Sequence, residues 1–207
     1  MTLQQLLLYS SQIVALIAAI WCWKHYKNST QKYFLHYTIF VVLIEFFAIL
    51  FKDTENSNYF VYNIYILISF LFYFYWFSLV LPIQKKWIFG LISMFLGAYF
   101  LSFLNEDIMS QILHLPINVG TILLLFCIIS LFSSLLTNKD EIDFLKSQKF
   151  WIATGMLIFY LGYLPIQYLP PLGKSFKLDY SFIITLLNVI YSLCLTISFY
   201  VSKYNRV

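Results

Sequence analysis

The chain has 207 residues, of which 61% are hydrophobic and only 11% are charged. Soluble domains have about a quarter of their residues charged, so this composition excludes an ordinary soluble fold and indicates a chain solvated by lipid. The net charge is +4, but the basic residues form no stripe with interleaved aromatic residues, which argues against direct nucleic-acid binding.

Apolar runs long enough to cross a bilayer occur seven times. A hydrocarbon core of about 30 Å requires roughly 20 apolar residues in a helix, and lipid offers the backbone no hydrogen-bond partner. The sequence therefore predicts an all-α polytopic membrane protein, with a single seven-helix transmembrane domain over residues 1–207. The spans are expected at about residues 3–23, 33–51, 59–81, 87–104, 115–136, 150–168 and 180–201.

The first apolar run is expected to remain in the protein as a transmembrane helix. It has no basic segment before it, it is too long for a signal peptide, and no A-x-A cleavage site follows it. The three cysteines, Cys22, Cys127 and Cys194, lie in or at the end of apolar runs without C-x-x-C spacing. We therefore expect buried thiols and neither a disulfide framework nor a zinc site.

Basic residues are distributed unequally between the two sets of connections. One side, made of the first, third and fifth connections and the C-terminal tail, holds Lys24, Lys27, Lys32, Lys85, Lys86, Lys139, Lys146, Lys149, Lys203 and Arg206. The other side holds only Lys52, Lys174 and Lys177. Because basic loops stay in the cytoplasm, we expect the N-terminus outside and the C-terminus in the cytoplasm.

The longest cytoplasmic connection covers residues 137–149. Ile142, Phe144 and Leu145 suit a short helix at the membrane interface, and a solvated polar loop is the alternative. This connection and the C-terminal tail are where a cytoplasmic protein partner is expected to dock.

Glu45 is the one ionisable residue well inside an expected span, in the run "FVVLIEFFAIL". Thr38, Val41, Ala48 and Lys52 share its helix face, which predicts that the carboxyl group points toward the other helices. Carboxylates inside membranes are costly and usually functional. A ligand, proton or cation site is therefore one interpretation, and a hydrogen-bonded packing residue is the other.

Other polar residues lie at a similar depth, in the expected outer halves of the spans. Together with Glu45 they predict a polar pocket on the extracellular side, formed by Gln12, Asn63, Tyr65, Asn118, Tyr163 and Asn188.

The last two spans carry further patterns. One face of the last span forms a polar stripe, which includes Ser181, Thr185, Asn188, Ser192 and Thr196, and which either bonds neighbouring helices or lines a cavity. The sixth span contains Gly155, Gly162 and Pro165. Gly162 and Pro165 form a candidate hinge, while close packing at the glycines is the alternative.

No catalytic, metal-binding or cofactor-binding constellation is present in the sequence. The three histidines, His25, His36 and His114, lie in separate elements without an H-E-x-x-H pattern, and no G-x-S-x-G frame occurs. The last span has no lysine before Lys203 that would hold retinal. We therefore expect a protein that is not an enzyme and has no cofactor.

The segments "HYTIFVVLIEFFAIL", "YNIYILISFLFYFYW", "FWIATGMLIFYLGYLPIQYLP" and "LLNVIYSLCLTISFY" resemble small seven-helix membrane proteins of Bacteroidota-type bacteria, a group whose activity is unassigned. Some of these are similar to the input halves of bacterial sensor proteins. The resemblance implies the bacterial inner membrane and a sensory or regulatory module that signals through a cytoplasmic partner. The alternative is a small channel or an accessory membrane effector, for example in a bacterial antiviral system of the CRISPR type.

Overall fold

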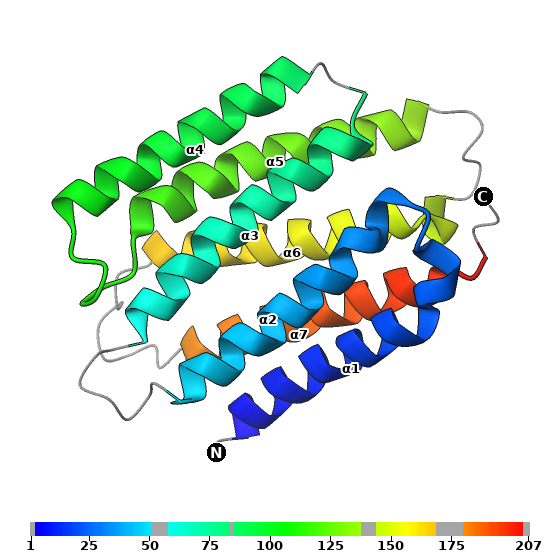
Figure 1. The fold of residues 1–207 in the computed structure, drawn as a ribbon, viewed down its shortest axis with the longest axis horizontal. Coiled ribbons are helices and arrows are strands. Elements are labelled where there is room, and N and C mark those ends of the chain that lie inside the picture. The colour runs from blue at the N-terminus through cyan, green and yellow to red at the C-terminus, as the bar shows by residue number, and fades with distance from the viewer. Residues whose placement is uncertain (1–2, 51–57, 83–84, 138–143, 169–179, 205–207) are drawn as a thin grey trace. The chain divides into compact units, whose positions relative to one another are not determined.

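The structure is a computed structural model that describes residues 3–50, 58–82, 85–137, 144–168 and 180–204. Within these ranges it consists of seven long α-helices and two short 3₁₀ helices (Figure 1). The elements are α1 (Leu3–Tyr26), η1 (Thr30–Lys32), α2 (Tyr33–Leu50), α3 (Tyr59–Val80), α4 (Lys85–Asn105), α5 (His114–Thr137), η2 (Phe144–Lys146), α6 (Gln148–Tyr168) and α7 (Tyr180–Val201).

The prediction of seven membrane-length helices is confirmed. Each helix begins and ends within three residues of its expected span, and each is long and apolar enough to cross a bilayer. The helices are this regular because a backbone in hydrocarbon satisfies its hydrogen bonds only within the segment. Two prolines lie where helical bonding tolerates them: Pro116 is in the first turn of α5, and Pro82 directly follows the extended residue Leu81 that ends α3. Pro165 lies inside α6.

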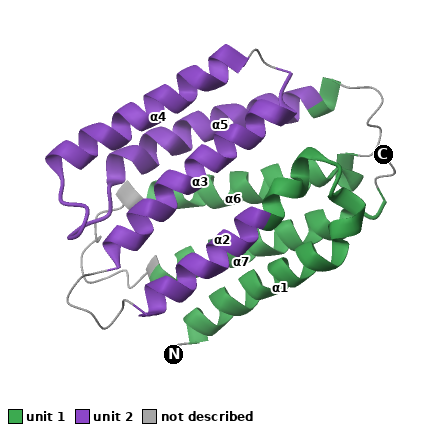
Figure 2. Ribbon diagram, in the orientation of Figure 1, with its two compact units in different colours: residues 1–35, 135–207 green, residues 36–134 purple. Residues whose placement is uncertain are grey.

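The chain divides into two compact units (Figure 2). Unit 1 comprises residues 1–35 and 135–207, and unit 2 comprises residues 36–134. In unit 1, α7 packs alongside both α1 and α6. The ring of Tyr26 lies 5.3 Å from that of Phe199 between α1 and α7, and Phe159 lies 6.0 Å from Tyr191 between α6 and α7. Helix α7 is therefore the central helix of this unit.

In unit 2, α3 is the helix that contacts all of the others. Its Phe72 stacks on Tyr37 of α2 at 4.6 Å, and its Phe70 lies 5.1 Å from Phe95 of α4. On α5, Gly120 faces the same Phe70 ring. Phe70, Phe74 and Phe95 are all buried. The core of unit 2 is therefore built from aromatic rings that radiate from α3.

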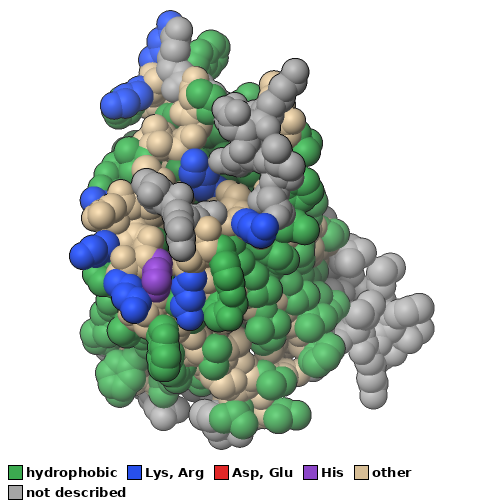
Figure 3. All heavy atoms as spheres, turned by 90° about the vertical axis from the view of Figure 1, so that its right-hand side faces the viewer, with side chains coloured by type: hydrophobic (Ala, Val, Ile, Leu, Met, Phe, Trp, Pro, Cys, Tyr) green, Lys and Arg blue, Asp and Glu red, His purple; other side chains and the backbone are tan. Residues whose placement is uncertain are grey.

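The surface follows the pattern of a membrane protein. Large apolar side chains are exposed along every long helix, as expected where lipid is the solvent. Every lysine among the described residues lies at a helix end or in a connection on the side predicted to be cytoplasmic, whereas Glu106 and Asp107 lie in the connection after α4. Figure 3 shows lysine side chains surrounded by apolar ones.

The glycines of α6 lie where α7 packs closely against it. A Cβ atom built on Gly155 would come 2.8 Å from the Cβ of Cys194 and 2.9 Å from the ring of Tyr191. A Cβ atom on Gly162 would come 2.6 Å from Leu187. The glycines therefore allow the close packing of α6 on α7 that is one of their two interpretations. Helix α6 continues through Pro165 to Tyr168. The role of Gly162 and Pro165 as a hinge stays a prediction.

We expect Gly155→Val to lower the stability of the protein by about 1–3 kcal/mol, since the new side chain forces α6 and α7 apart. The matched control is Gly97→Val on α4, where a Cβ atom meets nothing within 4 Å. Thermal unfolding of the detergent-solubilised proteins measures the effect. Equal midpoints for the two variants would contradict this account of the α6–α7 contact.

Candidate functional site

The most concentrated polar feature of unit 2 is a group of four hydroxyl side chains between α2 and α3, which we call the hydroxyl cluster: Tyr37, Tyr65, Ser69 and Tyr73. The Tyr37 hydroxyl is at the centre. It lies 3.4 Å from the Tyr65 hydroxyl, donates to the Ser69 hydroxyl at 3.4 Å, and shares a short hydrogen bond with the Tyr73 hydroxyl. Four hydroxyl groups thus form one connected network.

The sequence explains why these side chains meet. On α3, residues 65, 69 and 73 are spaced four apart and therefore share one helix face. Tyr37 reaches this face from α2, where its ring stacks on Phe72, while Phe40 stacks on the Tyr65 ring at 6.1 Å. Aromatic stacking on both sides fixes the positions of the tyrosine hydroxyls.

The hydroxyl cluster lies in an environment with little water. Tyr37, Ser69 and Tyr73 are buried, and Tyr65 is half-buried. In such surroundings hydrogen bonds are electrostatically stronger than in water, and a hydroxyl that loses its partner is costly. The network therefore links α2 to α3.

Glu45 lies close to this network. It lies on α2 two turns after Tyr37, is half-buried, and interacts electrostatically with the phenol of Tyr65. Thr38 and Ala48, which share its helix face, are buried, as the face analysis predicts. Glu45 and Tyr65 are thus two predicted pocket residues that the structure brings together, at one edge of the hydroxyl cluster.

Asn63, also predicted for the pocket, holds the connection between α4 and α5. Its amide Nδ2 donates to the carbonyl oxygens of Ile108 and Gln111 at 3.0 and 2.9 Å, and its Oδ1 accepts from the Leu113 amide at 3.0 Å. The backbone carbonyl of Asn63 accepts from the Tyr99 hydroxyl at 3.2 Å. Its side chain is buried and bonded to the protein, so it acts as a structural tie.

The other predicted pocket residues are divided between the units. Gln12, Tyr163 and Asn188 belong to unit 1, where Asn188 donates to the Ile184 carbonyl of its own helix at 2.9 Å. Asn118 belongs to unit 2 and lies one turn from the buried Thr121 on α5. The Oδ1 of Asn118 and the Oγ1 of Thr121 have no hydrogen-bond partner among the described residues. Buried polar groups of this kind usually bind water or a ligand.

The polar stripe of α7 bonds mainly to its own helix. The hydroxyls of Thr185 and Thr196 donate to the carbonyl oxygens of Ser181 and Ser192, each at 2.8 Å. Among the described residues, Ser181 is the member of the stripe that bonds another helix, through a 2.9 Å hydrogen bond from its hydroxyl to Oε1 of Gln4 on α1. Bonding to the preceding turn is the usual way in which Ser and Thr satisfy themselves in a membrane helix.

Sequence reasoning missed three of the four members of the hydroxyl cluster. The sequence predicts a polar site for Tyr65 alone among the four. The available signal was the spacing of Tyr65, Ser69 and Tyr73 on α3. It is hard to detect in a chain with 17 tyrosines, most of which need no partner at a membrane interface.

The described residues contain no group of three or more His, Cys, Asp or Glu side chains placed to hold a metal ion. Cys22, Cys127 and Cys194 are buried free thiols, as the sequence predicts. Comparisons with protein families, with curated proteins and with solved structures found no match to this chain.

We expect Asn63→Leu to be strongly destabilising, because it leaves two backbone carbonyls and one amide of the connection after α4 without their partner. Each unsatisfied buried group costs about 1–3 kcal/mol. The matched control is Asn105→Leu, since Asn105 is exposed and bonds only the Leu101 carbonyl of its own helix. Thermal unfolding in detergent compares the two, and a stable Asn63→Leu protein would contradict the structural role.

Tyr37→Phe is expected to lower stability by about 1–2 kcal/mol, because removing one hydroxyl breaks the contacts with Tyr65, Ser69 and Tyr73 while leaving the stacked ring in place. Tyr59→Phe, at the exposed start of α3, is the control. Hydrogen exchange of the α2 and α3 backbone amides should increase in the first variant alone. Unchanged exchange in both would show that the hydroxyl cluster does not hold α2 against α3.

Proposed function

We propose that this chain is a non-enzymatic sensory or regulatory module of a bacterial inner membrane, with its N-terminus outside and its C-terminus in the cytoplasm. In this proposal Glu45 and the hydroxyl cluster take up a proton or a small polar ligand, and the resulting change passes to a cytoplasmic protein partner. The observation that carries the proposal is the connected hydroxyl network beside the one carboxyl group inside a span.

The network is suited to switching because hydroxyl groups both donate and accept. In the contacts of Tyr37 with Tyr65 and with Tyr73, either oxygen can be the donor. An ionised Glu45 attracts the hydroxyl hydrogen of Tyr65, so Tyr65 then accepts the single hydroxyl hydrogen of Tyr37, which is otherwise donated to Ser69. When Glu45 is neutral, Tyr65 is released to donate to Tyr37, and the direction of the bonds beyond it reverses.

The members of the hydroxyl cluster on α3 follow one another along that helix. The backbones of Tyr65 and Tyr73 are eight residues apart on α3, or about 12 Å at a rise of 1.5 Å per residue, and their hydroxyls meet at the Tyr37 hydroxyl. Tyr73 lies nearer the lysine-bearing end of α3, and Tyr65 nearer the opposite end. In this proposal a change in charge at Glu45 acts on the Tyr65 hydroxyl and reaches Tyr73 through the Tyr37 hydroxyl, toward the predicted cytoplasmic end of α3.

Part of the expected partner-docking surface lies outside the described residues. This applies to residues 138–143 of the predicted cytoplasmic connection and to residues 205–207 of the tail. Beside them, η2 presents Phe144 and Leu145 as exposed apolar side chains, and the Trp151 indole donates to the Leu145 carbonyl at 2.8 Å. These residues are the described candidates for partner contact.

The test is whether a cytoplasmic position responds to a change on the opposite side through Glu45. A fluorophore on Lys149→Cys, in protein reconstituted in liposomes, reports movement at the start of α6 when the external pH is stepped. The native thiols are buried and react slowly, so the label is specific. We expect Glu45→Gln to abolish the fluorescence change, whereas Glu106→Gln, a carboxyl group in a connection, should retain it.

Two results would contradict the proposal. A stable Glu45→Leu protein with a full fluorescence response would show that the carboxyl group is a packing residue. Robust ion or proton flux through the purified protein, measured with a dye enclosed in the liposomes, would favour the alternative of a small channel.

A further inference from the structure

The end of unit 1 at which α1 and α7 terminate is strongly positive. Lys24, Lys27 and Lys32 follow one another around the end of α1 and η1, and Lys203 follows α7. Residues 24–35 and 199–207 contain no Asp or Glu, and neither does any part of unit 1 that the structure describes. The positive charge at this end therefore has no counter-charge among these residues.

The lysines of the two helices lie at the same end because α1 and α7 run side by side in the same direction. Tyr26 of α1 packs on Phe199 of α7, with their ring centroids 5.3 Å apart. The ammonium groups of Lys32 and Lys203 lie over the rings of Tyr33 and Tyr200, at 5.2 and 4.6 Å. Lys24 and Lys27 are the exposed cations of the group.

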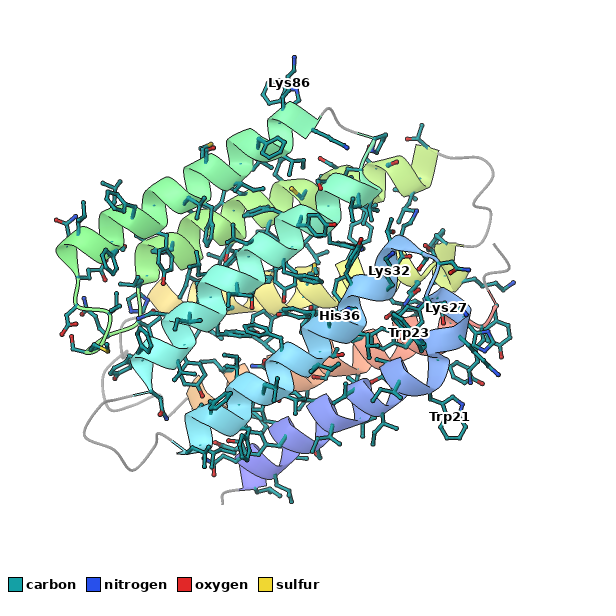
Figure 4. All side chains as sticks on the ribbon, in the orientation of Figure 1. Trp21, Trp23, Lys27, Lys32, His36 and Lys86 are labelled. Carbon is teal, nitrogen blue, oxygen red and sulfur yellow. The ribbon has the colours of Figure 1, made fainter. Side chains whose placement is uncertain are left out.

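An exposed apolar stripe on α1 leads to these two lysines. Ile13, Ile17, Ile20 and Trp21 are spaced at helical intervals and share one face, and Lys24 is the next residue on it. All four apolar side chains are about half exposed or more, and Trp21, at 74%, is the most exposed tryptophan. In Figure 4 Trp21 projects outward from α1, and Lys27 lies at the end of the same helix.

We propose that this face of α1 is a binding site for an anionic phospholipid of the leaflet at the lysine end. Lys24 and Lys27 hold the phosphate group, Trp21 lies at the level of the glycerol backbone, and an acyl chain lies along Ile17 and Ile20. Lysine binds phosphate as a point charge, and tryptophan prefers the membrane interface.

A lipid suits the site better than a soluble phosphate for two reasons. The apolar stripe and the lysines are continuous, so one amphiphilic molecule satisfies both, whereas a soluble anion leaves Trp21 and the isoleucines without a role. The two ammonium groups also lie at the C-terminal end of α1, where the partial negative charge of the helix weakens the binding of any anion. A soluble phosphate therefore binds weakly here unless another interaction helps to hold it. The negative surface potential of an anionic leaflet adds to the attraction of the two ammonium groups.

Brominated lipids test the proposal, because they quench tryptophan fluorescence on contact. Protein in mixed micelles is titrated with brominated phosphatidylglycerol and, separately, with brominated phosphatidylcholine. The quenching that disappears in Trp21→Phe reports this site. We expect the anionic lipid to bind in preference to the zwitterionic one. The variant Lys24→Gln/Lys27→Gln should weaken its binding about 25-fold, at about fivefold for each lysine.

The matched control is Lys85→Gln/Lys86→Gln, which removes the same charge from exposed positions at the start of α4. It should change the Trp21 signal less than twofold, and Lys24→Arg/Lys27→Arg should retain the preference. Equal binding of the two lipids, or an equal loss in the control variant, would overturn the proposal. So would displacement of the brominated lipid by millimolar inorganic phosphate, which would identify a soluble anion as the occupant.

Discussion

The structure depends on one constraint: in hydrocarbon, every polar group must find its partner within the protein. The backbone meets this constraint by forming helices, and most polar side chains meet it by bonding the preceding turn, as Thr185, Thr196 and Ser198 do. These local bonds require nothing from another helix. The hydroxyl cluster differs because Tyr37 on α2 bonds side chains of α3, and this makes it a specific link between two helices.

Lipid also removes the hydrophobic effect as a force between helices. The helices therefore associate largely through van der Waals contacts between surfaces of matching shape. The two units achieve it in different ways. In unit 1, glycines on α6 let α7 approach until a single added carbon would collide with it. In unit 2, aromatic rings fill the space between α3 and its neighbouring helices. Phe70 packs against Phe95 of α4, and its ring occupies the place that a side chain at Gly120 of α5 would take. Contacts of this kind tolerate little change in volume.

The sequence predicted the helices well and the site only in part, for a physical reason. A transmembrane helix is a local property of some 20 residues, so all seven were found. A site is formed by side chains from different helices, and helical spacing shows which face a residue shares but not which helix lies opposite. Asn63 illustrates the difference. Its position along α3 predicts a pocket residue. In the structure its side-chain amide forms hydrogen bonds with the backbone of the connection after α4.

The surroundings of Glu45 differ from those of Asn63. Asn63 has three backbone partners and no reason to move, because any movement leaves buried groups without bonds. The hydroxyls around Tyr37 keep their bonds when their direction reverses, so they can change state at little cost. In the proposed function, ionisation of a carboxyl group next to such a network changes the direction of its hydrogen bonds. A carboxyl group among alkyl chains has no such effect on its neighbours. In the proposed function, this neighbour is the reason that a carboxyl group lies inside a span at position 45.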